Sequence, residues 1–178
     1  MHATPSLIPC IGCGALVPDI EGPSFRYPES GSPGCWVIYN EILAREYQDF
    51  GYAAVHQLSV DTAASPYAVQ HPGRRTPQTI QSVNVHLISL CLVLERGCDA
   101  ARATQIMDRA VRRFKGQFAW LEPPASRGAL TVLDVVRAGD AEEHQRQVRR
   151  WAESAWEAWS FHHATIHAWV GRLEKEQR

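Results

Sequence analysis

The stretch SVNVHLISLCLVLERG, residues 82–97, decides the fold. From Val85 to Leu94 it is apolar on nearly all sides except at His86 and Ser89, and its apolar spacing predicts a helix over about Gln78–Arg96. Gly97 follows where a C-terminal cap glycine is expected. A helix without a polar face belongs in the middle of a bundle, so the stretch predicts an all-α protein.

The flanking sequence predicts further helices around this central one. Apolar residues recur every three or four positions, and the expected helices cover about residues 35–50, 52–61, 100–114, 130–139 and 140–173. We expect AASPY, residues 63–67, to interrupt the second of them. Thr131, followed three residues later by Asp134, predicts an N-terminal cap, and a strand over residues 129–136 is the lesser alternative.

The predicted architecture is one domain over residues 1–178, a bundle of about five to six helices with an irregular N-terminal region. Six prolines punctuate residues 1–34, and such a segment buries little apolar surface. We therefore expect residues 1–34 to be an irregular zinc-knuckle segment pinned by a metal, and residues 35–178 to form the bundle.

Composition excludes several classes of function. The formal net charge is −1 and no long basic run is present, which argues against nucleic-acid binding. The longest apolar run has about ten residues where a membrane span needs about 20, and no signal peptide is visible. We expect a cytoplasmic protein with no membrane partner. The sequence indicates an unknown small molecule or protein as partner and leaves the oligomeric state open.

The cysteines indicate a metal site. PCIGCG, residues 9–14, is a turn in which Cys10 and Cys13 converge, and Cys35 is predicted to open a helix, where a thiolate is stabilised. Disulfides are rare in the cytosol, so these three thiolates are expected to bind zinc. His71 is the first candidate for the fourth ligand, followed in order of preference by His56 and His163. Unliganded structural thiols and a redox switch are the alternatives.

The histidines suggest a second kind of chemistry. We expect His56, Asp61, His86 and His163 to line a pocket near the metal as catalytic residues, with Asp61 orienting an imidazole. The alternative for His86 is a core residue hydrogen-bonded to Ser82 or Ser89. His163 and His167 are four residues apart, so they lie either on a solvated flank or together on a metal.

Several motifs together resemble an uncharacterised bacterial family, common in actinobacteria, that is described only as a domain of unknown function. They are CIGCGA, GCW, VDT, YAVQHPG, SVNVHLISLCLVLERG and WAESAWEAWSFHHATIHAW, which span nearly the whole chain. The resemblance maps onto Cys10, Cys13, Cys35, Asp61, His71, His86, His162 and His163. Relative to that family, AASP looks inserted and His167 stands where arginine is common. The resemblance implies no activity.

A looser likeness is to the DinB-like helical bundles, in which three histidines hold a metal. His86, His163 and His167 could mimic that arrangement, although those proteins lack a cysteine knuckle and their elements follow another order.

Three functional hypotheses follow. The first is a metal-dependent enzyme for hydrolysis or group transfer, with zinc on the cysteines beside the histidine pocket. The second is a non-enzymatic interaction or regulatory module in which the zinc is structural. The third is a thiol redox sensor. Four protein ligands on the metal would favour the second, and an open position facing the histidines would favour the first.

Overall fold

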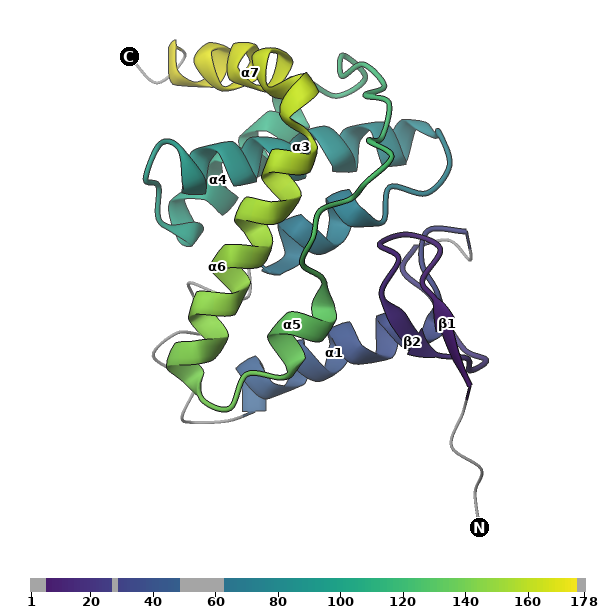
Figure 1. Cartoon of the computed structure of the whole chain (residues 1–178). Helices are drawn as coiled ribbons and strands as arrows, with labels where there is room; N and C mark the ends of the chain where they lie inside the picture. Colours follow the sequence, from purple (N-terminus) through teal and green to yellow (C-terminus); the bar gives the residue numbers. More distant parts are fainter. Residues whose placement is uncertain (1–5, 27–28, 49–62, 176–178) are drawn as a thin grey trace.

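The computed structural model describes residues 6–26, 29–48 and 63–175 and consists mainly of helices, with one small two-stranded sheet (Figure 1). Residues 63–70 are helical, and the other elements are β1 (Leu7–Pro9), β2 (Leu16–Pro18), α1 (Pro33–Gln48), α3 (Pro77–Leu94), α4 (Ala100–Arg113), α5 (Val132–Val136), α6 (Ala141–Ala158), a 3-10 turn η2 (Ser160–His162) and α7 (His163–Lys175). The predicted all-α bundle is confirmed.

The helix α3 is the centre of the larger of two hydrophobic clusters. It contacts α4, α6 and α7, and its side chains Leu87, Ile88, Leu90 and Leu92 are buried. By length and mean hydropathy α3 could cross a membrane, but the core helix of a soluble protein meets the same criteria. Its packing among three helices is that of such a core helix.

The second cluster joins the N-terminal segment to the bundle. It contains buried side chains of the hairpin, α1, residues 63–70, α5 and the first half of α6, with Trp151 of α6 among them. Trp151 donates its indole N–H to the buried Gln70 side chain, at 2.8 Å. Gln70 in turn donates to the carbonyls of Arg127 and Leu130. The helix α6 therefore connects the two clusters.

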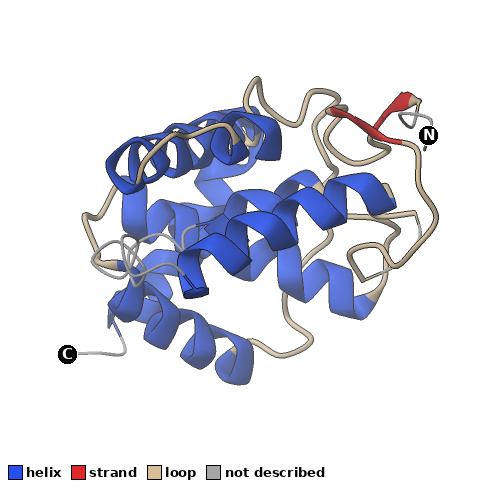
Figure 2. Cartoon of the chain, turned by 90° about the horizontal axis from the view of Figure 1, so that it is seen from below, coloured by secondary structure: helices blue, strands red, loops and turns tan. Residues whose placement is uncertain are grey.

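The N-terminal segment is more regular than predicted. β1 and β2 form an antiparallel hairpin in which Ile8 is paired with Val17, and Figure 2 shows it at one edge of an otherwise helical molecule. The hairpin packs against the start of α1, because Gly34 leaves room for the backbone of Pro18: a Cβ on Gly34 would lie 2.2 Å from the Pro18 oxygen.

The expected break at residues 63–67 is wrong. Residues 63–70 do not interrupt a helix but form one, because Ser65, Tyr67 and Val69 are completely buried and packing outweighs the local effect of Pro66. The helix expected before them, over about residues 52–61, lies outside the described residues.

The long helix predicted from Asp140 to Leu173 is two helices. Trp159 leaves helical geometry, with ψ near 12°, and the turn η2 redirects the chain so that α7 packs against α3 (Figure 1). The imidazole of His163 donates to the carbonyl of Trp156 at 3.0 Å, and the same carbonyl accepts from the N–H of Trp159 at 2.9 Å, so both hold the end of α6. Both halves keep their apolar faces on the core, which is why the periodicity alone predicted one helix.

Candidate metal centre

The hairpin turn positions the first two thiols. Cys10 follows β1 directly, and its N–H donates to the carbonyl of Ala15, at 2.7 Å. Its own carbonyl accepts from the N–H of Gly14, at 2.9 Å, and Gly14 has φ 78°, a conformation that favours glycine. The turn thereby brings Cys10 and Cys13 to the same side, as the spacing of PCIGCG predicts.

The third thiol comes from the start of α1. Cys35 lies in the first turn, and its N–H donates to the carbonyl of Ser32, at 3.0 Å. Ser32 also connects this helix start to the hairpin, because its N–H donates to the Cys10 sulfur at 3.4 Å and its hydroxyl accepts from Ile11. The Cys13 and Cys35 sulfurs are 3.8 Å apart.

His71 supplies a nitrogen from the end of the helical segment 63–70. Its Nδ1 is 2.7 Å from the carbonyl of Tyr67, and since a carbonyl can only accept, Nδ1 carries the proton. Nε2 is then free to donate its lone pair, and it lies 3.5 Å from the Cys10 sulfur and 3.4 Å from the Cys35 sulfur. A carbonyl that fixes the tautomer of a ligating histidine is a common arrangement at metal sites.

The four donor atoms have the spacing of a tetrahedral zinc site. All lie within 4.8 Å of one another. Zinc–sulfur bonds of about 2.3 Å and zinc–nitrogen bonds of about 2.0–2.1 Å imply tetrahedral edges of about 3.8 Å between sulfurs and about 3.6 Å between sulfur and nitrogen. The observed 3.8, 3.5 and 3.4 Å are close to these values. The residues present fit a bound zinc ion, and Cys10, Cys35 and His71 are at most 3% exposed, with Cys13 partly exposed.

Contacts within the cluster shift the pKa values of its members in opposite directions. Hydrogen bonds from the Cys13 and Cys35 thiols lower the pKa of Cys10 far below its ordinary value, although burial opposes this. The same contacts and burial raise the pKa of Cys35. Burial would lower the pKa of His71, but its contacts with Cys10 and Cys13 raise it to about 9. Without a metal the negative charge therefore lies on the Cys10 sulfur, and a divalent ion would replace the proton of Cys35 and the proton on Nε2 of His71.

Close packing fixes the ring of His71. One face stacks on Tyr67, with ring centroids 4.1 Å apart, and Tyr67 stacks on Tyr39 at 3.9 Å. Near Gly12 and Gly31 there is no space for a side chain: a Cβ would lie 2.3 Å and 2.7 Å, respectively, from the Cδ2 atom of His71. The sequence did not predict that these two glycines make room for His71. Their places in the chain could have indicated it, because Gly12 lies between Cys10 and Cys13 and Gly31 shortly precedes Cys35.

The structure does not place His86 in the cysteine cluster. His86 lies on α3, where its Nδ1 is 3.2 Å from the hydroxyl of Ser65 rather than bonded to Ser82 or Ser89. It lines a separate pocket of about 250 Å³ that also contains Arg26 and Gln78. Burial, and secondarily the charge of Arg26, lower the pKa of His86 to about 3, so the imidazole is neutral near pH 7.

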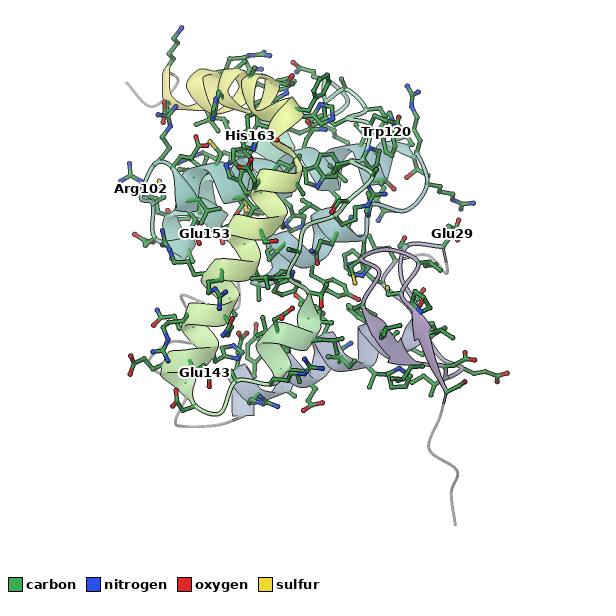
Figure 3. All side chains as sticks on the ribbon, in the orientation of Figure 1. Glu29, Arg102, Trp120, Glu143, Glu153 and His163 are labelled. Carbon is green, nitrogen blue, oxygen red and sulfur yellow. The ribbon has the colours of Figure 1, made fainter. Side chains whose placement is uncertain are left out.

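His163 lies at the junction of α6 and α7, as labelled in Figure 3, and not with the cysteines. Its ring stacks on Trp156 at 3.7 Å, and its Nε2 is bonded to the carbonyl of Trp156, whereas the Nε2 of His167 is bonded to Glu95. Because the two Nε2 atoms have different partners, His163 and His167 do not face one common metal site. The expected pocket of converging histidines is not formed by His71, His86 and His163, and its other predicted members, His56 and Asp61, lie outside the described residues.

Comparison with known proteins gives one match. The model of a family of unknown function (DUF5946) matches residues 8–160, a range that includes all four residues of the cysteine–histidine cluster. No curated protein and no solved structure matches the chain. Neither the family description nor a relative assigns an activity to the site.

Proposed function

We propose that this chain, which belongs to the DUF5946 family of unknown function, binds one zinc ion through Cys10, Cys13, Cys35 and His71 and uses it to hold the N-terminal segment on the helical bundle. The observation that carries the proposal is the complete donor set: three sulfurs and one imidazole nitrogen at tetrahedral spacing. Three thiolates and one histidine form one of the common structural zinc sites in proteins.

The choice of zinc rests on the chemistry of the donors. Soft thiolate ligands favour zinc, copper(I) and iron–sulfur clusters over magnesium, calcium and manganese, and a tetrahedral site with both sulfur and nitrogen donors is typical of zinc. A reducing compartment such as the cytoplasm would keep the thiols available for the metal.

The proposed ion connects three segments that are distant in sequence. Cys10 and Cys13 belong to the hairpin, Cys35 to the start of α1, and His71 to the segment that leads into α3. The free energy of binding a structural metal contributes directly to folding. Zinc would thus order a segment that buries little apolar surface of its own.

The proposal favours a non-enzymatic interaction or regulatory module over a zinc enzyme at this centre. Catalytic zinc usually keeps a position for water or substrate, whereas here four protein donors complete a tetrahedron. The protein would then act through the surface of the bundle, and the zinc would maintain the shape of that surface.

X-ray absorption spectroscopy on the zinc-loaded protein tests the coordination. After dialysis against EDTA we expect one zinc ion per chain, with three sulfur neighbours and one imidazole nitrogen. Cys35→Ser should lose this zinc, and Cys98→Ser should retain it, because Cys98 lies between α3 and α4 and outside the cluster. A fifth neighbour, or zinc bound without the imidazole of His71, would argue for an open catalytic site instead.

A further inference from the structure

A second group of unlike donor atoms lies where α7 packs against α3. Cys91 and Glu95 are four residues apart, at the end of α3, so they share a face, and His167 comes from α7. The sulfur, carboxylate oxygen and imidazole nitrogen lie within 4.8 Å of one another.

The contacts of Glu95 resemble those of a ligating carboxylate. Its Oε1 accepts a hydrogen bond from the indole N–H of Trp156, at 3.0 Å. Its Oε2 faces both other donors, at 3.7 Å from the Cys91 sulfur and 2.6 Å from the Nε2 of His167. Hydrogen bonds from His167 and Trp156 lower the pKa of Glu95, although burial opposes this. One oxygen is thus fixed by an outer indole while the other is directed at the cluster.

We propose that Cys91, Glu95 and His167 form a second, solvent-facing site for a divalent transition-metal ion such as Zn²⁺ or Co²⁺. This proposal is independent of the cysteine–histidine centre, with which it shares no residue. Cys91 is fully buried, whereas the side chains of Glu95 and His167 are 33% and 41% exposed. Three protein donors and an exposed side leave a coordination position for water or another ligand.

The charge and geometry of the site can accommodate such an ion. On binding, the Cys91 thiol proton leaves to solvent and the neutral imidazole of His167 carries its proton on Nδ1, so that a thiolate and a carboxylate balance the two positive charges. Zinc bond lengths imply about 3.6 Å between sulfur and oxygen and about 3.4 Å between nitrogen and oxygen. The contact of Cys91 with Glu95 already matches, and Nε2 of the half-exposed His167, now 2.6 Å from the carboxylate oxygen, must move outward.

An ordinary ion pair is the competing interpretation. A half-exposed His167–Glu95 pair would contribute little to stability and would not need a thiol beside it. The two interpretations differ in whether the Cys91 sulfur binds a cation.

Cobalt titration distinguishes them. Protein that has been dialysed against EDTA and retains its resident zinc is titrated with Co²⁺ while bound zinc is measured in the same sample. We expect uptake of one Co²⁺ per chain, without zinc release, and a thiolate-to-cobalt charge-transfer band.

Variants assign the band. Cys91→Ser should abolish it, and His167→Gln should weaken Co²⁺ binding by at least the roughly 10- to 100-fold that loss of an outer-shell partner costs. Cys98→Ser and His162→Gln serve as matched controls, since neither residue belongs to the cluster, and should bind Co²⁺ like the parent. The His167→Gln change lies on a half-exposed side chain, so the test does not depend on whether Cys91→Ser folds.

Three results would overturn the second site: no Co²⁺ uptake, a charge-transfer band that persists in Cys91→Ser, or Co²⁺ uptake matched by release of the resident zinc. Release of zinc would assign the cobalt to the cysteine–histidine centre. The zinc measurement therefore distinguishes a failure of the Cys91–Glu95–His167 site from a failure of the cysteine–histidine centre.

Discussion

At the scale of single residues, the cysteine–histidine centre depends on neighbours that donate nothing to a metal. The ring of His71 is held by Tyr67 on one face and by the absence of side chains at Gly12 and Gly31. Its tautomer is fixed by the backbone carbonyl of Tyr67. The orientation of the nitrogen is therefore a property of packing as much as of the histidine itself.

The glycine at position 12 provides a test at this scale. We expect Gly12→Ala to displace the His71 ring, because the new Cβ would lie 2.3 Å from its Cδ2 and 2.5 Å from the carbonyl of Ser30. Overpacking of this kind costs about 1–3 kcal/mol. Zinc affinity, measured by competition with a chromophoric chelator, should fall, and the melting temperature should fall with it.

Gly171→Ala is the matched control, since Gly171 lies inside α7 and has open space around its Cα. Alanine is favoured over glycine within a helix by about 0.5–1 kcal/mol, so this variant should be as stable as the parent or more stable, with unchanged zinc binding. If Gly12→Ala binds zinc like Gly171→Ala, His71 is not confined as described.

At the scale of elements, the turn between α6 and α7 is the feature on which the packing of the C-terminal half depends. It redirects α7 onto α3 and places His167 beside Glu95. His163 stabilises this turn in two ways, by stacking on Trp156 and by donating to its carbonyl.

Replacing His163 tests whether its role is structural. A stacked aromatic pair contributes about 0.5–1.5 kcal/mol and a hydrogen bond about the same, so His163→Ala should lower the free energy of unfolding by about 1–3 kcal/mol. Urea denaturation measures the loss. His163→Gln keeps a side-chain donor without the aromatic ring and should lie between alanine and the parent.

The zinc that resists EDTA should remain in both variants, because His163 is not part of the cysteine–histidine cluster. The opposite result would be a His163→Ala protein that keeps its stability but has lost this zinc. That result would indicate that His163 is a metal ligand.

At the scale of the whole molecule, the two hydrophobic clusters differ in what holds them. The cluster around α3 consists of apolar side chains, most of them from α3, α4, α6 and α7, whereas the cluster around α1 includes Cys10, Cys35 and the hairpin residue Val17. The two are connected through α6, whose Trp151 and Trp156 belong to one cluster each. Metal loss should therefore affect the two parts of the molecule unequally.

Hydrogen–deuterium exchange with and without zinc tests this asymmetry. Stripping the protein with a strong chelator under reducing conditions should remove protection from residues 6–26 and from the start of α1, because their order depends on the metal. The amides of α3 should stay protected, since their cluster contains none of the four ligands. A uniform loss of protection over the chain would show instead that the zinc stabilises the whole domain as one unit.

Local features of this fold follow from the sequence alone. The apolar α3, the left-handed glycine Gly97 (φ 63°) shortly after its end, and the capping box of Thr131 and Asp134 were predictable, because a cap or a helix end is decided by a few adjacent residues. The three cysteines were likewise identifiable from their spacing and from the predicted start of α1.

Features that join distant segments were decided by the tertiary structure. Periodicity could not show the turn at residues 159–162, since both helices that flank it keep the same apolar stripe. The sequence ranked His71 first as fourth ligand, but only the docking of residues 63–70 against the hairpin places its nitrogen among the three sulfurs. The pairing of Glu95 with His167 depends on the crossing of α7 over α3 in the same way. Spacing along the chain fixes which side chains share a face, whereas convergence of faces depends on how the elements pack.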